Sequence, residues 1–518
     1  MCYAEGELGT TTIAMSVVIM NILYDENVDG VLPRVDKQQL LSALEADMPD
    51  LTVLSRHEDL RPYECDGLSA YRTVPLLVLL PERIEQVESI LRICHRLQVP
   101  VVARGSGTGL SGGALPLEQG VLLVMSRFNR ILEINAQGRY ARVEPGVRNL
   151  AISQAAAPLN LYYAPDPSSQ IACSIGGNVA ENAGGVHCLK YGLTVHNLLQ
   201  VEILTVEGER LTLGAESLDC PGFDLLALFT GSEGMLGVVT QVTVKLLPKP
   251  QVAKVLLAAF DSVEKAGTAV GSIIAAGIIP GGLEMMDNLA IRAAEDFIHA
   301  GYPVDAAAIL LCELDGVESD VHDDCTRVRQ ILIEAGATEV LLAQDEAQRV
   351  RFWAGRKNAF PAVGRLSPDY YCMDGTIPRR ALPGVLKRIA ELSSEYGLRV
   401  ANVFHAGDGN MHPLILFDAN TPGELERAEQ LGGRILELCV SVGGSITGEH
   451  GVGREKINQM CAQFNADELT AFHAIKAAFD PSGLLNPGKN IPTLHRCAEF
   501  GAMHVHNGQL PFPELERF

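Results

Sequence analysis

The chain has 518 residues, and its 41 basic and 63 acidic residues give a formal charge of −22 at pH 7. This acidic balance excludes the basic surface of a nucleic-acid-binding protein, and the length allows two or three domains with substantial cores. Hydrophobic residues make up 47% of the chain and glycine accounts for 50 residues, a composition typical of a folded, loop-rich enzyme.

The N-terminal residues 1–23 are expected to be a disordered leader. The apolar run at residues 12–20 is shorter than the roughly 20 residues of a membrane span, and it follows Glu5 and Glu7 rather than lysines. The sequence therefore predicts neither a signal peptide nor a direct membrane span, and it favours a cytoplasmic protein.

Residues 24–250 are expected to form the first domain, in which short β runs alternate with glycine-rich loops. The clearest strands are residues 76–80, 99–103 and 120–125. Apolar residues at helical spacing separate the first two strands, so the domain opens with a βαβ unit. Two later β runs flank Glu207 and Gly208 as a hairpin. A long β run then ends at Pro248 and Pro250, where we place the domain boundary.

Residues 251–455 are expected to form an α+β domain of the ferredoxin-like type, with its helices on one face of the sheet. The expected strands are residues 252–260, 307–314, 339–343, 399–404 and 411–417. The expected helices are residues 263–275, 325–336, 382–396 and 424–442. Residues 456–494 then form a C-terminal helical segment with a helix at 466–479, and residues 495–518 a tail.

The first glycine-rich loop, ARGSGTGLSGG at residues 103–113, contains a match to the GxGxxG dinucleotide motif. Only seven residues, 114–120, separate it from the next β run, and one of them is Pro116, so the helix of a Rossmann site does not fit. No lysine follows the glycines, which excludes a Walker phosphate loop. The remaining interpretations are a flexible structural loop or a nest of backbone N–H groups for a phosphate, with Arg104 adding positive charge.

A second cluster at residues 165–185, PDPSSQIACSIGGNVAENAGG, follows in the same domain. It combines a rigid proline turn with closely spaced glycines and asparagines. Two nests in one domain favour a ligand that has both a pyrophosphate and a planar ring.

A second constellation lies near the C-terminus. The motif HAGDGNMH places His405 and His412 on either side of a tight turn at residues 407–410, which can fold both imidazoles towards one point. Glu449 and His450 stand in a second glycine-rich turn, GEHGVG. Two histidines and a glutamate with open positions suit a zinc-like or manganese-like ion that also binds substrate. The alternatives are that the histidines cap turns, or that a hydrolase uses the same ion to activate water.

These motifs carry a family resemblance. RGSGTGLSGG, PDPSS, CSIGGNVAENAGG, KYGLT and TGSEGMLGVVT resemble the FAD-binding domain of the vanillyl-alcohol oxidase superfamily. HAGDGNMH, GEHGVGREK and LNPGKN are similar to the C-terminal domain of its FAD-linked oxidase branch, and the resemblance spans residues 24–492. It implies a two-lobed FAD-binding domain, then a ferredoxin-like substrate or cap domain, then a C-terminal helical segment that returns to the flavin domain.

The resemblance also implies a set of FAD-binding residues. These are Arg104, Gly105, Ser106, Gly107, Thr108, Gly109, Pro165, Asp166, Ser168, Gly176, Gly177, Asn178, Asn182, Gly184, Gly185, Glu233, Gly237, Val239 and Asn486. The first group surrounds the pyrophosphate, residues 165–168 and 176–178 line the flavin, and residues 233–239 contact the adenine end. Some members of the superfamily bind FAD covalently through a histidine of the first loop, which this loop lacks, so non-covalent FAD is expected.

In this branch the positions of His405, His412 and Glu449 bind a metal, and the position of His450 accepts the substrate proton. Arg356 matches the arginine that grips the substrate carboxylate, although a solvated helix charge is the alternative at this position. The implied reaction oxidises a small 2-hydroxy acid such as glycolate or D-lactate. In the relative that acts on D-2-hydroxyglutarate, a lysine and a threonine meet the second carboxylate, and the corresponding places here hold Cys372 and Phe360.

Within the branch, the chain is most similar to the flavin-binding subunits of bacterial glycolate oxidases. This resemblance implies partner subunits, including an iron–sulfur subunit, and peripheral contact with the inner membrane through them. The 12 cysteines are scattered, with Cys312 and Cys325 as the nearest pair, so the chain itself has no iron–sulfur motif. The alternatives are a D-lactate or D-2-hydroxyglutarate dehydrogenase acting on its own, and a flavin-binding scaffold without activity.

Overall fold

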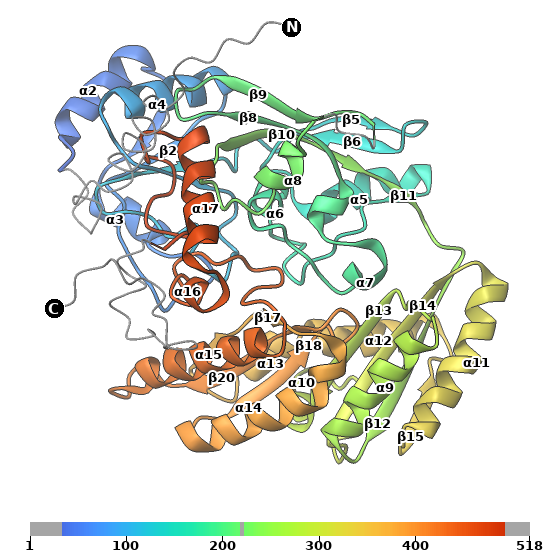
Figure 1. Cartoon of the computed structure of the whole chain (residues 1–518). Coiled ribbons are helices and arrows are strands. Elements are labelled where there is room, and N and C mark those ends of the chain that lie inside the picture. The colour runs from blue at the N-terminus through green and yellow to red at the C-terminus, as the bar shows by residue number, and fades with distance from the viewer. Residues whose placement is uncertain (1–33, 218–221, 493–518) are drawn as a thin grey trace, which may run out of the picture.

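A computed structural model describes residues 34–217 and 222–492. The expected leader and tail, residues 1–23 and 495–518, lie outside the described residues. Figure 1 shows an upper body formed by the N-terminal half and a lower body formed by the cap, here defined as residues 251–455. The C-terminal helix α17 (Ala466–Phe479) lies against the upper body. This is the α+β architecture that the sequence predicts.

The first sheet of the upper body has four strands in the order β1-β2-β4-β3. They are β1 (Thr52–Leu54), β2 (Leu77–Leu80), β3 (Val101–Arg104) and β4 (Val121–Val124). The helices beside them are α2 (Lys37–Asp47), α3 (His57–Leu60) and α4 (Ile84–Arg96). Strands β2 and β3 both run parallel to β4, and α4 buries Val87, Ile90 and Leu91, which gives the expected βαβ unit. Residues 105–120, all of which are described, contain no helix, so the first glycine loop is not a Rossmann loop.

The second sheet of the upper body has five strands in the order β5-β6-β10-β8-β9. They are β5 (Ile131–Asn135), β6 (Tyr140–Val143), β8 (Leu198–Leu204), β9 (Arg210–Gly214) and β10 (Val238–Lys245), and β8 and β9 form the expected hairpin. The helices of this half are α5 (Asn149–Ala156), α6 (Ile175–Glu181), α7 (Cys188–Tyr191) and α8 (Leu225–Phe229). Ile175 and Val179 of α6 share one apolar core with Val239 and Val242 of β10, and this packing fixes the second glycine cluster on the sheet.

The cap is built on one antiparallel sheet of seven strands. In pairing order they are β15 (Glu339–Leu342), β12 (Val252–Phe260), β14 (Ala308–Gly316), β13 (Gly282–Asp287), β18 (Val400–Phe404), β20 (Pro413–Phe417) and β16 (Asp369–Cys372). Two short strands, β17 (Gly375–Thr376) and β19 (Asn410–Met411), pair beside this sheet.

Helices cover both faces of the cap sheet, so the expectation that they lie on one face is wrong. On one face lie α9 (Val263–Ala275), α11 (Glu318–Glu334), α14 (Leu382–Tyr396) and α15 (Glu424–Ser441). On the other face lie α10 (Asn288–Ile298), α12 (Glu346–Lys357) and α13 (Ala359–Val363). The physical reason is visible along β12, where Leu256 and Ala258 enter one core while Val255 and Leu257 enter the other. A continuous apolar strand of this kind requires cover on both sides.

The C-terminal segment returns to the upper body, as expected. After α16 (Met460–Gln463) and α17, the chain runs beside β3, where Val101 N donates to Leu484 O and Asn486 N donates to Val101 O. Lys476 on α17 donates from Nζ to Met235 O at 2.7 Å. Among the helices of the described part, none is long and apolar enough to cross a membrane.

Candidate active site

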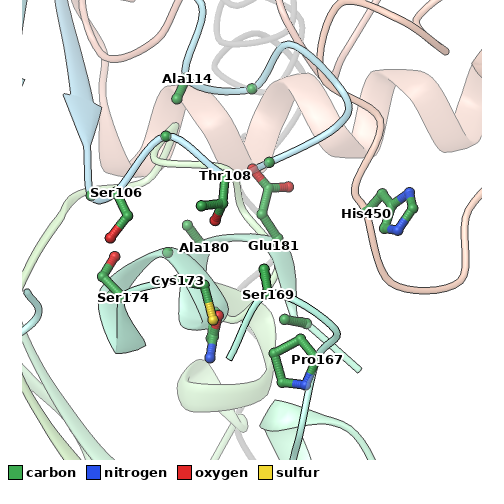
Figure 2. A pocket seen from close by; sticks show the side chains of 18 of the residues that line it. Ser106, Thr108, Ala114, Pro167, Ser169, Cys173, Ser174, Ala180, Glu181 and His450 are labelled. Carbon is green, nitrogen blue, oxygen red and sulfur yellow. The ribbon is translucent and has the colours of Figure 1, made fainter. Parts of the chain in front are cut away.

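A cavity of about 510 Å³ brings the two sequence constellations together. The expected site residues that line it are Arg104, Gly105, Ser106, Gly107, Thr108, Gly109, Ser168, Gly176, Gly177, Asn178, Gly184, Glu233, Gly237, Val239, His412, Glu449 and His450. In Figure 2, Ser106 and Thr108 of the first glycine loop face Cys173 and Ser174 across this space, and His450 stands at one end. The glycine-rich loops and part of the histidine cluster therefore share one cavity.

Several polar atoms on the cavity wall are buried without a partner among the described residues. They are Ser174 Oγ, Asn178 Nδ2 and Glu181 Oε2. Burial, followed by repulsion from Glu233 and Asp66, raises the pKa of Glu181 well above its ordinary value. Buried polar groups without partners are costly, so this wall is suited to a polar ligand.

Five of the expected cofactor-binding residues stand outside the cavity lining. They are Pro165, Asp166, Asn182, Gly185 and Asn486. Gly185 has φ +141°, and a Cβ there would lie 2.5 Å from the carbonyl of Asp166, so glycine allows the two segments to approach closely. Asn486 Nδ2 donates to Gly113 O at 2.9 Å and to Glu233 O at 2.7 Å, which ties the C-terminal segment to both sides of the cavity.

His405, His412 and Glu449 converge as the HAGDGNMH turn predicts. Nε2 of His405 lies 3.4 Å from Glu449 Oε1, and Nε2 of His412 lies 3.0 Å from the same oxygen. The turn between the histidines depends on Gly409, whose φ is +86° and whose Cα lies against Ile377 O. The three side chains offer one ligand atom each within 4.8 Å of one another, a donor set that fits a divalent ion.

The other ring nitrogens of these histidines are held from behind. Nδ1 of His405 lies 2.8 Å from Glu284 Oε1, and Nδ1 of His412 lies 3.3 Å from Met373 O. Such contacts place the proton on Nδ1 and leave Nε2 free to bind a metal. Burial opposes charge on Glu449, yet hydrogen bonds from both histidines lower its pKa well below the ordinary value, so it is ionised. Glu284, on β13, was not predicted from the sequence, which offered only a glutamate inside an apolar run.

His450 lies beside the three potential ligands. Its ring stacks on that of His412, with centroids 4.8 Å apart and planes inclined by 16°. Burial lowers its pKa to about 4, so the imidazole is neutral at pH 7, and within the described structure its Nδ1 has no hydrogen-bond partner. A neutral, unpartnered imidazole in a cavity is a suitable proton acceptor.

A buried carboxylate, Asp374, holds the backbone that carries Glu449 and His450. It accepts from the N–H groups of Gly448 at 3.1 Å, Glu449 at 3.2 Å and His450 at 2.8 Å. Asp374 was also missed by the sequence analysis as a functional residue, because nothing in DYYCMDG indicates which backbone its side chain meets.

Arg356 is buried, and its guanidinium faces Glu284 rather than the cavity. Its Nη2 lies 2.7 Å from Glu284 Oε2, while Nε and Nη2 have no aligned hydrogen-bond acceptor among the described residues. The alternative of a solvated helix charge is therefore wrong. The neighbouring Lys357, which does line the cavity, was not selected from the sequence.

Comparisons with known proteins agree with this architecture. Residues 75–214 match the model of the FAD binding domain family, and residues 249–490 match the model described as FAD linked oxidases, C-terminal domain. The chain is 80% identical over 499 residues to glycolate oxidase subunit GlcD of Escherichia coli strain K12, covering 96% of this chain and 100% of that protein. It is 39% identical over 428 residues to glycolate oxidase subunit GlcD of Bacillus subtilis strain 168, covering 82% and 91%. Among solved structures, 4-ethylphenol oxidase from Gulosibacter chungangensis superposes with a TM-score of 0.74 at 18% identity, covering 90% of this chain and 100% of the other, and so shares the fold.

Proposed function

Because the chain belongs to the family of FAD-linked oxidases, we propose that it oxidises a small 2-hydroxy acid, with glycolate as the first candidate, to the 2-oxo acid. The observation that carries this proposal is the meeting of the two glycine-rich loops and the cluster of His412, Glu449 and His450 in one cavity. FAD, the cofactor of the family, supplies the acceptor for the hydride on C2 of the acid.

The cavity residues fit FAD without any covalent link. The glycine-rich wall and the partnerless Ser174 Oγ and Asn178 Nδ2 suit a pyrophosphate and a polar ring. Residues 104–113 contain no histidine, cysteine or tyrosine that could be joined to the flavin. Acid precipitation is expected to release the yellow colour into the supernatant. Colour retained in the pellet would reveal a covalent bond, for which Cys173 on the cavity wall is a candidate.

His405, His412 and Glu449 would hold a divalent ion, zinc-like or manganese-like, and such an ion would lower the pKa of the substrate hydroxyl. Glu284 fixes the ring of His405, and the Met373 carbonyl fixes that of His412. His450, neutral and beside the cluster, takes the hydroxyl proton. Arg356 contacts Glu284 through Nη2, and its proposed second role is to grip the substrate carboxylate with its other N–H donors.

A metal held by His405, His412 and Glu449 in a protein that binds no flavin would suit a hydrolase. A protein that binds flavin but converts no substrate would suit a scaffold. A spectrum under anaerobic conditions separates the three. We expect the purified protein to be yellow and to bleach when glycolate is added. Colourless protein would favour the hydrolase, and yellow protein that no 2-hydroxy acid bleaches would favour the scaffold.

Electrons must leave the reduced cofactor. The relatives are named as subunits, and the chain has no iron–sulfur motif of its own, so we propose that a partner subunit with iron–sulfur clusters accepts them. The isolated chain should then reduce an artificial dye far faster than it reduces oxygen. Rapid formation of peroxide would contradict this proposal.

A further inference from the structure

Cys372 forms a second group of potential ligands with His412 and His450. The sulfur of Cys372 and one nitrogen each of His412 and His450 lie within 4.8 Å of one another. Cys372 is 4% exposed and His412 1% exposed, so the group is protected from bulk water. The assumed roles of His405, His412 and Glu449 make no use of the thiol.

The contacts of this group show donor atoms with little else to bind. Cys372 Sγ and His412 Nδ1 both approach the same acceptor, Met373 O, at 3.4 and 3.3 Å. Nδ1 of His450 is buried and has no hydrogen-bond partner in the described part of the chain. A metal ion would have to displace contacts to one carbonyl oxygen, and His450 Nδ1 would give up no hydrogen bond from the described part of the chain.

The chemistry of the donors differs from that of the neighbouring trio. One sulfur and two imidazole nitrogens select a thiophilic ion such as Zn²⁺, Cd²⁺ or Cu⁺, whereas a carboxylate and two imidazoles also accept Mn²⁺. A tetrahedral zinc ion, with bonds of about 2.0–2.3 Å, holds its ligand atoms roughly 3.5 Å apart. The three side chains therefore need to close by little more than about 1 Å.

We propose that Cys372, His412 and His450 form a second, inhibitory site for a thiophilic metal ion. His412 would use Nδ1 here, since its Nε2 faces Glu449, and that Nδ1 carries a proton towards Met373 O. Binding therefore exchanges two protons for the ion, one from the Cys372 thiol and one from His412 Nδ1, and a metal–thiolate bond forms. The ion also uses a lone pair of His450 and brings positive charge to its ring, which prevents that imidazole from accepting the substrate proton. The inhibition rests on the proposed function of His450, whereas the binding of the ion does not.

The test uses the full chain with FAD bound and Mn²⁺ supplied, and adds CdCl₂ stepwise. We expect a cadmium–thiolate charge-transfer band in the ultraviolet, two released protons and a falling rate of flavin reduction. In Cys372→Ala and Cys372→Ser the band should shrink by one thiolate. The cadmium concentration that halves each variant's own rate should rise by at least about tenfold, the scale on which metal sites respond to altered ligands.

Other cysteines are controlled by Cys312→Ala, which removes a buried thiol of the cap sheet and should leave the band and the inhibition as they are. Retained flavin colour and an unchanged thermal midpoint show that each variant folds, and either Cys372 variant suffices for the comparison. A full band in both Cys372 variants, or its absence from the unchanged protein, would overturn the site. A band that depends on Cys372 while flavin reduction keeps its rate would leave the site standing and count against His450 as the proton acceptor.

Discussion

Removal of the His450 side chain should slow the reaction without loss of the metal or of FAD. Its ring stacks on His412 but does not belong to the three potential ligands, so His450→Ala should keep both the metal and the FAD. Loss of a general base slows the step it serves by roughly 10² to 10⁴. We therefore expect slower flavin reduction by glycolate in stopped-flow absorbance, with unchanged metal content. His322→Ala, an exposed histidine on α11, is the control, and an unaltered rate in His450→Ala would exclude the base role.

Glu284 should affect the metal affinity of the site indirectly, through its contact with His405. Burial opposes its charge, but His405 and Arg356 lower its pKa, so it remains an ionised acceptor behind His405 Nδ1. Replacing it by glutamine removes the charge and one acceptor oxygen, and changes of this kind lower metal affinity by about 10- to 100-fold. Competition with a chelator measures the affinity. Glu334→Gln on the exposed side of α11 is the matched control, and equal affinities would show that the His405 ring is held by packing alone.

We expect the uncharged side chains around His412 to favour small substrates with a single carboxylate. The Phe360 ring lies 6.2 Å from the His412 ring, and the Cys372 sulfur lies within 4.8 Å of a ring nitrogen of His412. Neither group can stabilise a distal carboxylate, and desolvating that charge without a partner costs several kcal/mol. We expect kcat/KM for glycolate to exceed that for D-2-hydroxyglutarate by at least about 10², equivalent to roughly 2.7 kcal/mol. Equal values would indicate that Lys357, on the cavity wall, pairs with the second carboxylate.

At the scale of residues, sequence reasoning succeeded where a residue type and a short spacing carry the chemistry. His405 and His412 were paired correctly because the turn between them is local. Glu284 and Asp374 were missed because their partners lie 121 and up to 76 positions away along the chain. Arg356 was placed on a helix correctly, yet no local pattern could show that its guanidinium turns to Glu284.

At the scale of elements, the loop of residues 447–453 is the part of the site that depends most on distant support. Asp374 of the cap accepts three of its N–H groups, and Glu233 of the upper body accepts those of Val452 and Gly453, both at 2.7 Å. Two buried carboxylates from different bodies thus fix the backbone of Glu449 and His450. Burial raises the pKa of Asp374, but His450 and Lys456 outweigh it and lower the value to about 2, so the carboxylate stays ionised at any working pH.

Asp374→Asn should therefore destabilise the protein and loosen the metal together. An amide has one acceptor oxygen in place of two, and each buried N–H left without a partner costs about 1–3 kcal/mol. Urea unfolding should show the loss of stability, and a chelator titration the loss of affinity. Asp305→Asn, at a side chain 98% exposed, is the control. Full stability with reduced metal affinity would mean that the loop has another anchor.

The elements that the sequence predicted best combine apolar residues at regular spacing with residues that mark the start or end of the element. Helices α9, α14 and α17 have the expected bounds, and Asn465 and Glu468 form a capping box at the start of α17. Strand β13 and helix α10 were not predicted, because Asp287 caps the helix directly after the strand and no glycine or proline separates them. The cap sheet was assigned helices on one face because its strand–helix–strand units suggested a ferredoxin-like domain, and the continuous apolar runs of its strands were not considered.

At the scale of the whole molecule, a polar seam joins the upper body to the cap beside the site. His187 of the upper body lies between Asp166, 3.0 Å from its Nδ1, and Glu313 of the cap, 3.2 Å from its Nε2. Lys190 and Tyr191 reach Asp315 of the cap at 2.6 and 2.5 Å. Every group of this seam is charged or strongly polar, so the fit between the two bodies should respond to pH.

His187 is the group through which that response should appear. Burial lowers its pKa, but Asp166 and Glu313 outweigh burial and raise it from 6.5 to about 10. A raised pKa in the folded protein stabilises the fold fully below the unfolded value of 6.5, and this contribution disappears as the pH rises towards 10. The other charge facing the pair is Arg349, 2.9 Å from Glu313, which keeps its charge throughout this range.

His187→Gln keeps hydrogen-bonding capacity but removes the positive charge. We expect the variant to unfold at a lower temperature than the unchanged protein at pH 7, and the difference between the two thermal midpoints to shrink steadily up to pH 10, because only the unchanged protein loses a proton there. His322→Gln, an exposed histidine without such neighbours in the described structure, should show no gap at either pH. A gap between His187→Gln and the unchanged protein that stays constant from pH 7 to pH 10 would mean that His187 is already neutral at pH 7. The two bodies would then be held at this point by hydrogen bonds alone.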